Sequence, residues 1–328
     1  MKKVVFIGHV DTGKSTLLGH ILYKNGYITE HELDKIQTQA IKEKMGRWKW
    51  ARILDIYEEE MTRGKTHEYV EIEINLNGEK VSLIDTPGHQ SFVREMINGI
   101  SCQVKSAIVM VSMIDNEFEA SFNNGMLKEH ILLSRCAGIN NYIIVANKMD
   151  AINWDEKKMR DKLDKVYKYL KTIGCSDEKI KSVPLDSYEG IGINSLDRMP
   201  DWYSGNDLFK NIENLPTPKN EAFIKEEKTG NMILVNFTLF KVPEMNPVIS
   251  AGFTGIIHYG GYGNNIGKET EVEIYKIEKS VMIKTMETKK IVFSMDKSID
   301  LGIKSRIILR HGNDTLGYGT VLNVKNRN

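Results

Sequence analysis

The chain has 328 residues, of which 41% are hydrophobic and 27% charged, and its formal net charge is +1. This composition is globular and long enough for two domains, which excludes a disordered or low-complexity chain. Cys102, Cys136 and Cys175 lack metal-site spacing, so we expect reduced thiols in the cytoplasm. The apolar runs fall short of the ~20 residues of a membrane span, so we expect no membrane association.

The first 215 residues alternate buried-strand runs with helical stretches, a pattern typical of a mostly parallel sheet with helices on both faces. Asn77-Gly78 joins the second and third strands and predicts a hairpin, so one strand should run antiparallel. The six strands are expected at Lys3–Gly8, Tyr69–Leu76, Val81–Asp85, Ala107–Met113, Tyr142–Asn147 and Ser182–Leu185. The helices are expected near 14–24, 90–100, 120–137, 155–173 and 206–214.

Residues 216–230 are rich in proline and then in charge, without apolar periodicity, and they predict a linker. Short β-rich runs fill residues 231–328, which suits a small antiparallel barrel or sandwich, and we expect a barrel. Its runs are Met232–Phe240, Gly255–Tyr259, Glu271–Ile277, Ile291–Ser294, Ser305–Leu309 and Gly319–Val324. The sequence therefore predicts an α/β domain over residues 1–215 followed by a small all-β barrel.

Residues 8–15 match the phosphate-loop pattern G-x-x-x-x-G-K-[ST], placed between a strand and a helix. In such a loop the backbone N–H groups and the positive end of the helix face phosphate oxygens. Lys14 can bridge the β- and γ-phosphates, and the Ser15 hydroxyl can bind Mg²⁺. The residues expected around the phosphates are Asp11, Thr12, Gly13, Lys14, Ser15 and Thr16.

Two further motifs follow predicted strands. Asp85 begins the run Asp-Thr-Pro-Gly-His, and a carboxylate at this place can hold Mg²⁺ through water, while Gly88 lets its N–H approach the γ-phosphate. In the run Asn-Lys-Met-Asp, Asp150 can accept hydrogen bonds from guanine donors that adenine lacks. Asn147 either bonds the base edge or braces the phosphate loop, and the stem of Lys148 covers the ring. These motifs predict GTP or GDP as the ligand and argue against an ATP-dependent kinase.

The motifs GHVDTGKST, DTPGH and NKMD resemble the GTPase domain of the elongation factor Tu/1-alpha family. Within it, RGKTHEYVEIEI and MPDWYSGNDLFKNIENLP are most similar to the eukaryotic class-II release factor and the Pelota-associated ribosome-rescue GTPase. The resemblance covers about residues 1–215. It implies an α/β P-loop GTPase domain with a mixed, mostly parallel six-stranded sheet that hydrolyses GTP with Mg²⁺.

The same resemblance implies roles around the γ-phosphate. Thr66 matches the switch threonine that closes on Mg²⁺, and His89 matches the histidine that positions the attacking water. Val10 matches one side of the apolar gate beside that histidine. The implied catalytic set is His89, Thr66, Lys14 and Gly88, and the implied metal set is Ser15, Thr66 and Asp85.

Two positions depart from the family pattern. Lys65 stands where many relatives have an apolar gate residue. In the fifth motif, Asp186 and Ser187 replace the usual serine and small residue, so the affinity for guanine is expected to be weaker than usual.

Residues 247–258 and 305–321 resemble the start and the last strands of the family's third domain. The linker has no room for the middle barrel, so the resemblance implies a member that lacks its second domain. It also implies as partners the ribosome, with ribosomal RNA near the switches, and a release-factor-like or Pelota-like protein on the β-barrel. We expect the protein itself to be a monomer.

The leading interpretation is a translational GTPase that acts in termination or ribosome rescue. The alternative is a GTP-sensing binding module or decoy that regulates a translation factor or the ribosome without ordinary turnover. The interleaved run Arg47–Arg52 suits either RNA contact or a helix that packs its tryptophans on the domain. His20, His31, His67 and His130 lack metal-ligand spacing and are expected to be ordinary surface or core residues.

Overall fold

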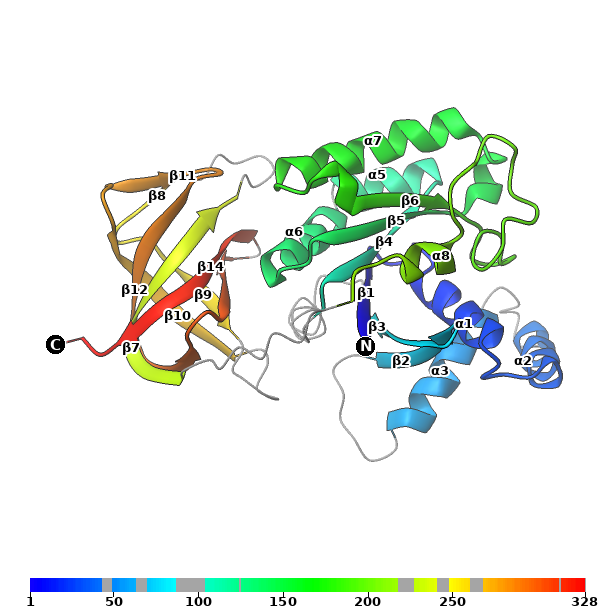
Figure 1. Ribbon diagram of the computed structural model, residues 1–328, viewed down its shortest axis with the longest axis horizontal. Helices are drawn as coiled ribbons and strands as arrows, with labels where there is room; N and C mark the ends of the chain where they lie inside the picture. The colour runs from blue at the N-terminus through cyan, green and yellow to red at the C-terminus, as the bar shows by residue number, and fades with distance from the viewer. Residues whose placement is uncertain are drawn as a thin grey trace.

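The computed structural model describes residues 1–42, 49–62, 70–86, 104–123, 125–217, 227–240, 248–259, 268–312 and 314–327, with backbone alone at 58–62, 70 and 227. The chain forms an α/β part, which carries the N-terminus, and a β-barrel, which carries the C-terminus (Figure 1). None of the helices within these ranges is long and apolar enough to cross a membrane.

The α/β part is built on a six-stranded sheet with the order β2-β3-β1-β4-β5-β6. Neighbouring strands are parallel except β2 and β3, which form a hairpin around Asn77 and Gly78, both with positive φ. The predicted mixed sheet is therefore confirmed. The strands are β1 (Lys2–Gly8), β2 (Val70–Leu76), β3 (Glu79–Asp85), β4 (Ser106–Ser112), β5 (Asn141–Asn147) and β6 (Ile180–Pro184).

Helices cover both faces of this sheet (Figure 1). They are α1 (Lys14–Lys24), α2 (Glu30–Lys42), α3 (Lys49–Thr62), α5 (Asp115–Asn123), α6 (Leu127–Ala137), α7 (Glu156–Thr172) and α8 (Leu208–Glu213). Two 3₁₀ turns, η3 (Met149–Ile152) and η4 (Asp177–Lys179), flank α7.

The helix prediction for residues 120–137 is wrong, because α5 and α6 are separate helices. Gly125 lies between them, and a Cβ there would be 2.6 Å from the Ala120 carbonyl oxygen, so the chain turns where only glycine fits. Helix α2 was not among the predicted elements, whereas α3 begins in the run Arg47–Arg52, for which a packed helix was one of the two interpretations. The predicted helix at 90–100 lies outside the described residues.

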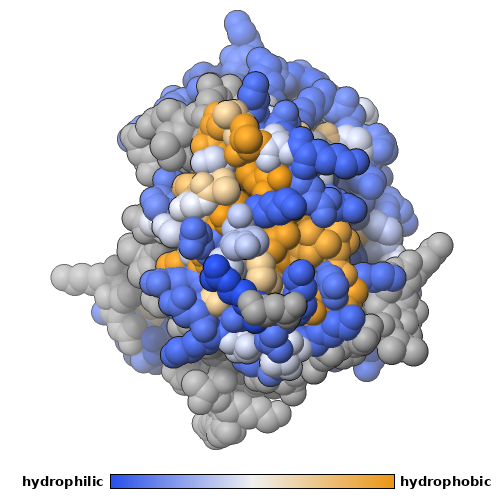
Figure 2. Space-filling model, turned by 90° about the vertical axis from the view of Figure 1, so that its left-hand side faces the viewer, coloured by the Kyte–Doolittle hydropathy of each residue, from blue (hydrophilic) through white to orange (hydrophobic). Residues whose placement is uncertain are grey.

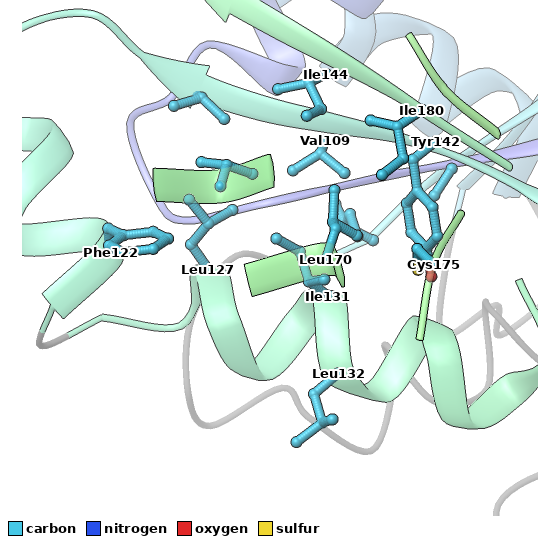
Figure 3. Packing of buried hydrophobic residues seen from close by; sticks show 14 of the residues in the cluster. Val109, Phe122, Leu127, Ile131, Leu132, Tyr142, Ile144, Leu170, Cys175 and Ile180 are labelled. Carbon is cyan, nitrogen blue, oxygen red and sulfur yellow. The ribbon is translucent and has the colours of Figure 1, made fainter. Parts of the chain in front are cut away.

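Two apolar clusters fill the two sides of the sheet. On one side, Leu127 and Ile131 point from α6 toward the sheet, whereas Leu132 points away from it (Figure 3). Each fully buried side chain of this kind contributes about 1.5–3 kcal/mol to folding. Because α6 is apolar on two sides, it can pack against the sheet with one side and against the C-terminal β-barrel with the other.

The C-terminal part of the chain is a closed six-stranded antiparallel barrel with the strand order β10-β12-β7-β14-β13-β9, which confirms the predicted barrel. Its strand β7 begins at Glu227, inside the predicted linker, because Glu227–Gly230 pair with Ile299–Gly302 of β12. The strands are β7 (Glu227–Leu239), β9 (Thr254–Tyr259), β10 (Lys268–Ile277), β12 (Thr288–Gly302), β13 (Arg306–His311) and β14 (Asp314–Lys325). A separate pair joins β8 (Val248–Ser250) to β11 (Met282–Lys284).

The barrel packs on α6, which lies between it and the sheet (Figure 1). The Glu129 carboxylate of α6 accepts a hydrogen bond from the Thr315 hydroxyl at 2.6 Å and lies 3.4 Å from Arg310. Arg306 donates to the Cys136 carbonyl at the end of α6, at 2.8 Å. Phe240 and Ile308 of the barrel part join the apolar cluster of the α/β part. The two parts therefore share an interface with both polar and apolar contacts.

Candidate nucleotide-binding site

The predicted motifs meet at one edge of the sheet. The phosphate loop follows β1, Asp85 ends β3, Asn147 ends β5, and Asp186 comes shortly after β6. These four strands are parallel to one another, so their carboxyl ends share an edge, which is where ligands bind in open α/β sheets.

The phosphate loop depends on unusual backbone angles. Asp11 and Gly13 have φ angles of 62° and 92°, and the Thr12 hydroxyl donates to the His9 carbonyl at 2.8 Å. The Lys14 ammonium donates to the carbonyls of Gly8 and His9 at 3.0 and 2.8 Å. Burial lowers the pKa of Lys14, whereas nearby Asp85 and Asp11 oppose that shift. Ser15 and Thr16 lie half-buried in the first turn of α1, so this turn presents hydroxyls beside a cation.

The end of β3 provides a carboxylate for a cation. Burial raises the pKa of Asp85 to about 6, although the Lys14 charge opposes this shift. The Oδ1 atom of Asp85 is buried and has no hydrogen-bond partner among the described residues. The Thr86 hydroxyl donates to the Phe6 carbonyl at 2.6 Å and ties the end of β3 to β1. A buried carboxylate oxygen that lacks a donor fits Mg²⁺, held directly or through water.

The described residues contain no group of three His, Cys, Asp or Glu side chains that could hold a metal ion. Magnesium in a phosphate-loop site does not need such a group, because its ligands are a loop hydroxyl, a single carboxylate and phosphate oxygens. Ser15 and Asp85 are therefore a sufficient protein contribution from this part of the chain.

Asn147 joins the phosphate end of the site to the base end. Its side chain is fully buried, and its Nδ2 donates to the Thr12 carbonyl at 2.8 Å while its Oδ1 accepts from the Ser187 N–H at 3.0 Å. Of the two roles considered for Asn147, the structure has the one that braces the phosphate loop. A Cβ on Gly13 would lie 2.3 Å from Asn147 Nδ2, so the loop approaches this amide closely.

Lys148 and Asp150 lie on the turn after β5. The Lys148 ammonium pairs with Glu117 at 2.6 Å, and Glu117 also accepts from the Ser112 hydroxyl at 2.6 Å. This pair fixes the far end of the lysine stem, which lies in the motif predicted to cover the base. The Asp150 side chain is exposed and can accept hydrogen bonds from a ligand.

Residues 186–190, which we call the base loop, are held by side-chain contacts. Asp186 Oδ1 accepts from the N–H groups of Tyr188 and Glu189 at 2.9 and 3.1 Å. Burial raises the pKa of Asp186, and the Asp150 charge adds to the shift. Since Asn147 takes the Ser187 N–H, three successive N–H groups of the loop already have acceptors. The unusual Asp186 therefore stabilises the loop in place of the usual serine.

Several predicted residues lie outside the described part of the chain: Thr66, Gly88 and His89, with Lys65 and the first two residues, 47 and 48, of the run Arg47–Arg52. Val10 is an exposed residue of the phosphate loop. Trp50 is buried, as expected if the run Arg47–Arg52 packs its tryptophans on the domain.

Sequence reasoning assigned no role to two histidines at the site. His20 of α1 makes a 2.9 Å hydrogen bond through Nδ1 to the Ser187 carbonyl. His130 of α6 makes one of 3.1 Å to the Gly8 carbonyl of the phosphate loop, and burial lowers its pKa to about 3. In the sequence, both histidines lie on apolar helix faces, which indicates that they are buried. The pattern does not reveal which carbonyl each ring bonds.

Comparisons with known proteins agree with this geometry. The family model of the elongation factor Tu GTP-binding domain matches residues 1–226. Elongation factor 1-alpha of Aeropyrum pernix is 39% identical over 220 residues, which are 66% of this chain and 50% of that protein. The eukaryotic peptide chain release factor GTP-binding subunit of Debaryomyces hansenii is 35% identical over 219 residues, or 65% of this chain and 31% of that protein. The chain thus spans about half the length, or less, of these relatives.

Among solved structures, the GTPase-like domain of S. cerevisiae Ski7 bound to GTP is similar over 98% of this chain and 96% of that chain. The TM-score is 0.76 at 14% sequence identity, so the likeness shows the fold.

Proposed function

Because the chain belongs to the family of the elongation factor Tu GTP-binding domain, we propose that it binds GTP with Mg²⁺ and hydrolyses GTP as a translation factor. The observation that carries the proposal is the buried Asn147 amide, which ties the phosphate loop to the base loop. This single side chain sets the spacing between the phosphate and base ends, as a nucleotide ligand requires.

Within this proposal, the residues have distinct tasks. Lys14 and the loop N–H groups hold the phosphates, and Asp150 accepts from guanine while Lys148 covers the ring. Ser15, Thr66 and Asp85 would hold Mg²⁺, which when bound neutralises charge on the phosphate oxygens. His89 orients the attacking water, and Gly88 presents its N–H to the γ-phosphate. Family resemblance supports the roles of Thr66, Gly88 and His89.

We further propose a role in termination or ribosome rescue, with a release-factor-like or Pelota-like partner on the barrel and ribosomal RNA near the switches. The barrel end carries apolar surface (Figure 2), and its exposed large apolar residues include Val248, Tyr275, Val281 and Met286. Val281 is 77% exposed. Exposed apolar surface of this kind often marks a protein contact, and a similar relative is a release factor subunit.

A second candidate, a GTP-sensing binding module without ordinary turnover, is favoured by the base loop. The N–H groups of residues 187–189 already have acceptors, so the loop offers guanine O6 fewer donors than the usual fifth motif. The loss of donors affects guanine binding only, because it does not involve the residues proposed to act at the γ-phosphate.

Single-turnover hydrolysis of GTP with and without ribosomes separates these candidates. A translational GTPase accelerates on the ribosome, and His89→Ala slows that reaction by a factor on the order of 10² or more while GTP affinity stays nearly constant. Tight GTP binding without ribosomal acceleration would instead support the binding module. If His89→Ala hydrolyses at the wild-type rate, the role given to His89 is wrong.

A further inference from the structure

Two aromatic side chains from different helices form a buried stack behind the base loop. His20 of α1 and Trp50 of α3 lie parallel, with ring centroids 3.9 Å apart and an angle of 14° between the planes. They are 4% and 3% exposed. The helices approach this closely because residue 19 is glycine, since a Cβ there would lie 1.9 Å from the Trp50 carbonyl oxygen.

The stack holds two successive carbonyls of the base loop. The His20 Nδ1 bonds the Ser187 carbonyl at 2.9 Å, and the Trp50 Nε1 donates to the Tyr188 carbonyl at 2.8 Å. Burial lowers the pKa of His20 to about 4, so at neutral pH the ring is neutral and Nδ1 carries the hydrogen that it donates. A Cβ on Gly190 would lie 2.4 Å from His20 Cε1, so the loop also packs directly on the ring.

The N–H groups of these two peptides belong to Tyr188 and Glu189, and Asp186 Oδ1 accepts from both, while Asn147 holds the preceding peptide through the Ser187 N–H. The peptide groups 187–188 and 188–189 are therefore fixed through their carbonyls by His20 of α1 and Trp50 of α3, and through their N–H groups by Asp186. A loop held on both sides needs little reorganisation when a base binds, which favours affinity.

We propose that His20 and Trp50 are positioning residues for guanine recognition, so that the packing of α3 sets the affinity of the base end. This inference rests on the proposed nucleotide binding and adds residues to it. Helix α3 ends at Thr62, four positions before Thr66 in the sequence. By linkage, a partner that binds more tightly when α3 is packed would tighten guanine binding, and guanine would tighten the binding of that partner by the same factor.

The test is the release of fluorescent GDP and GTP analogues from Trp50→Phe, which keeps a ring but loses the Nε1 donor. We expect release of both nucleotides to accelerate by the same factor, about 5–10-fold, which is the effect of one hydrogen bond. The factor is shared because the bond acts at the base end, which is identical in GDP and GTP. An effect on GTP alone would overturn the proposal, because it would place Trp50 at the γ-phosphate.

Tyr169→Phe is the matched control. Tyr169 of α7 donates from a largely buried aromatic side chain to the Lys128 carbonyl of α6 at 3.2 Å, so this hydrogen bond joins α7 to α6 and does not involve the base loop. It should lose a similar amount of thermal stability and release GDP within about twofold of the wild-type rate. Equal rates of GDP release from Trp50→Phe and Tyr169→Phe would show that Trp50 is only structural and would contradict the proposal.

Two variants at position 20 distinguish the effect of the hydrogen-bond donor from the effect of the ring. His20→Asn keeps a short N–H donor, whereas His20→Leu has none, so release should be slower from His20→Asn than from His20→Leu. Identical release from the two, with both variants folded by circular dichroism, would refute a role for the hydrogen bond. If the wild-type protein itself retains no guanine nucleotide, the proposed function fails first, so the two failures are distinguishable.

Discussion

Replacing Asn147 with alanine removes two buried hydrogen bonds that meet at one side chain. The Thr12 carbonyl and the Ser187 N–H lose their partners, at 2.8 and 3.0 Å, in a position with no exposed surface. Each unsatisfied buried group costs about 1–3 kcal/mol, so with two such groups the free energy of unfolding should fall by about 2–6 kcal/mol. Because both loops must be in place to bind nucleotide, much of this cost should appear in affinity, which we expect to fall by about 10²-fold.

Isothermal titration with GDP and Mg²⁺ measures this loss, and Asn211→Ala provides the control. Asn211 is also buried and donates to the carbonyls of Asn206 and Asp207, both at 2.9 Å, on α8. Its replacement should lower stability comparably and leave the affinity for GDP within about twofold. If Asn147→Ala binds GDP as tightly as Asn211→Ala does, the side chain does not join the two ends of the site and the reasoning fails.

Three further changes probe the base end, the buried His20 and the barrel interface. Asp150→Asn should lower GDP affinity by a factor on the order of 10² and favour xanthosine diphosphate, whose carbonyl accepts from the new amide; unchanged preference in competition titrations would remove Asp150 from the base site. The pKa of His20 is lowered to about 4, so its stabilising effect is present above the ordinary value near 6.5 and is lost as the pH falls toward 4. The destabilisation caused by His20→Asn in urea unfolding should therefore shrink by about 1–2 kcal/mol between pH 7 and pH 5, and a pH-independent difference would contradict that shift. Arg310→Ala leaves the largely buried Glu129 without its cation and should cost about 2–3 kcal/mol, most of it recovered when Glu129→Leu and Arg310→Leu are combined; no recovery in the double variant would show that the pair is not coupled.

The mixed sheet, the barrel and the motif positions could be predicted from the sequence, because each rests on local pattern. Buried strands such as Asn141–Asn147 are continuous apolar runs, and the Asn77-Gly78 turn has a sequence signature of its own. The phosphate loop is also readable because its glycine, lysine and serine positions follow from contact with phosphate.

Tertiary contacts explain most of what the sequence did not reveal. The sequence left open whether the start of α3 contacts RNA or packs on the domain, because the partner of Trp50 is His20 on another helix. Strand β7 was predicted too short because its first residues, which have no apolar alternation, are held by pairing with β12. The role of Asp186 could not be read from its type, because a carboxylate that accepts from two loop N–H groups looks in the sequence like a lost serine.

The most direct test of the central claim is competition for the site between guanine and adenine nucleotides. The protein, loaded with a fluorescent GDP analogue in Mg²⁺, is titrated with GTP, GDP, ATP and ADP. The geometry at Asp150 and the phosphate loop predicts that GTP and GDP displace the probe, while ATP and ADP need concentrations higher by a factor on the order of 10⁴. Displacement by ATP at the same concentration as GTP would contradict the claim that this chain is a guanine-nucleotide-binding protein.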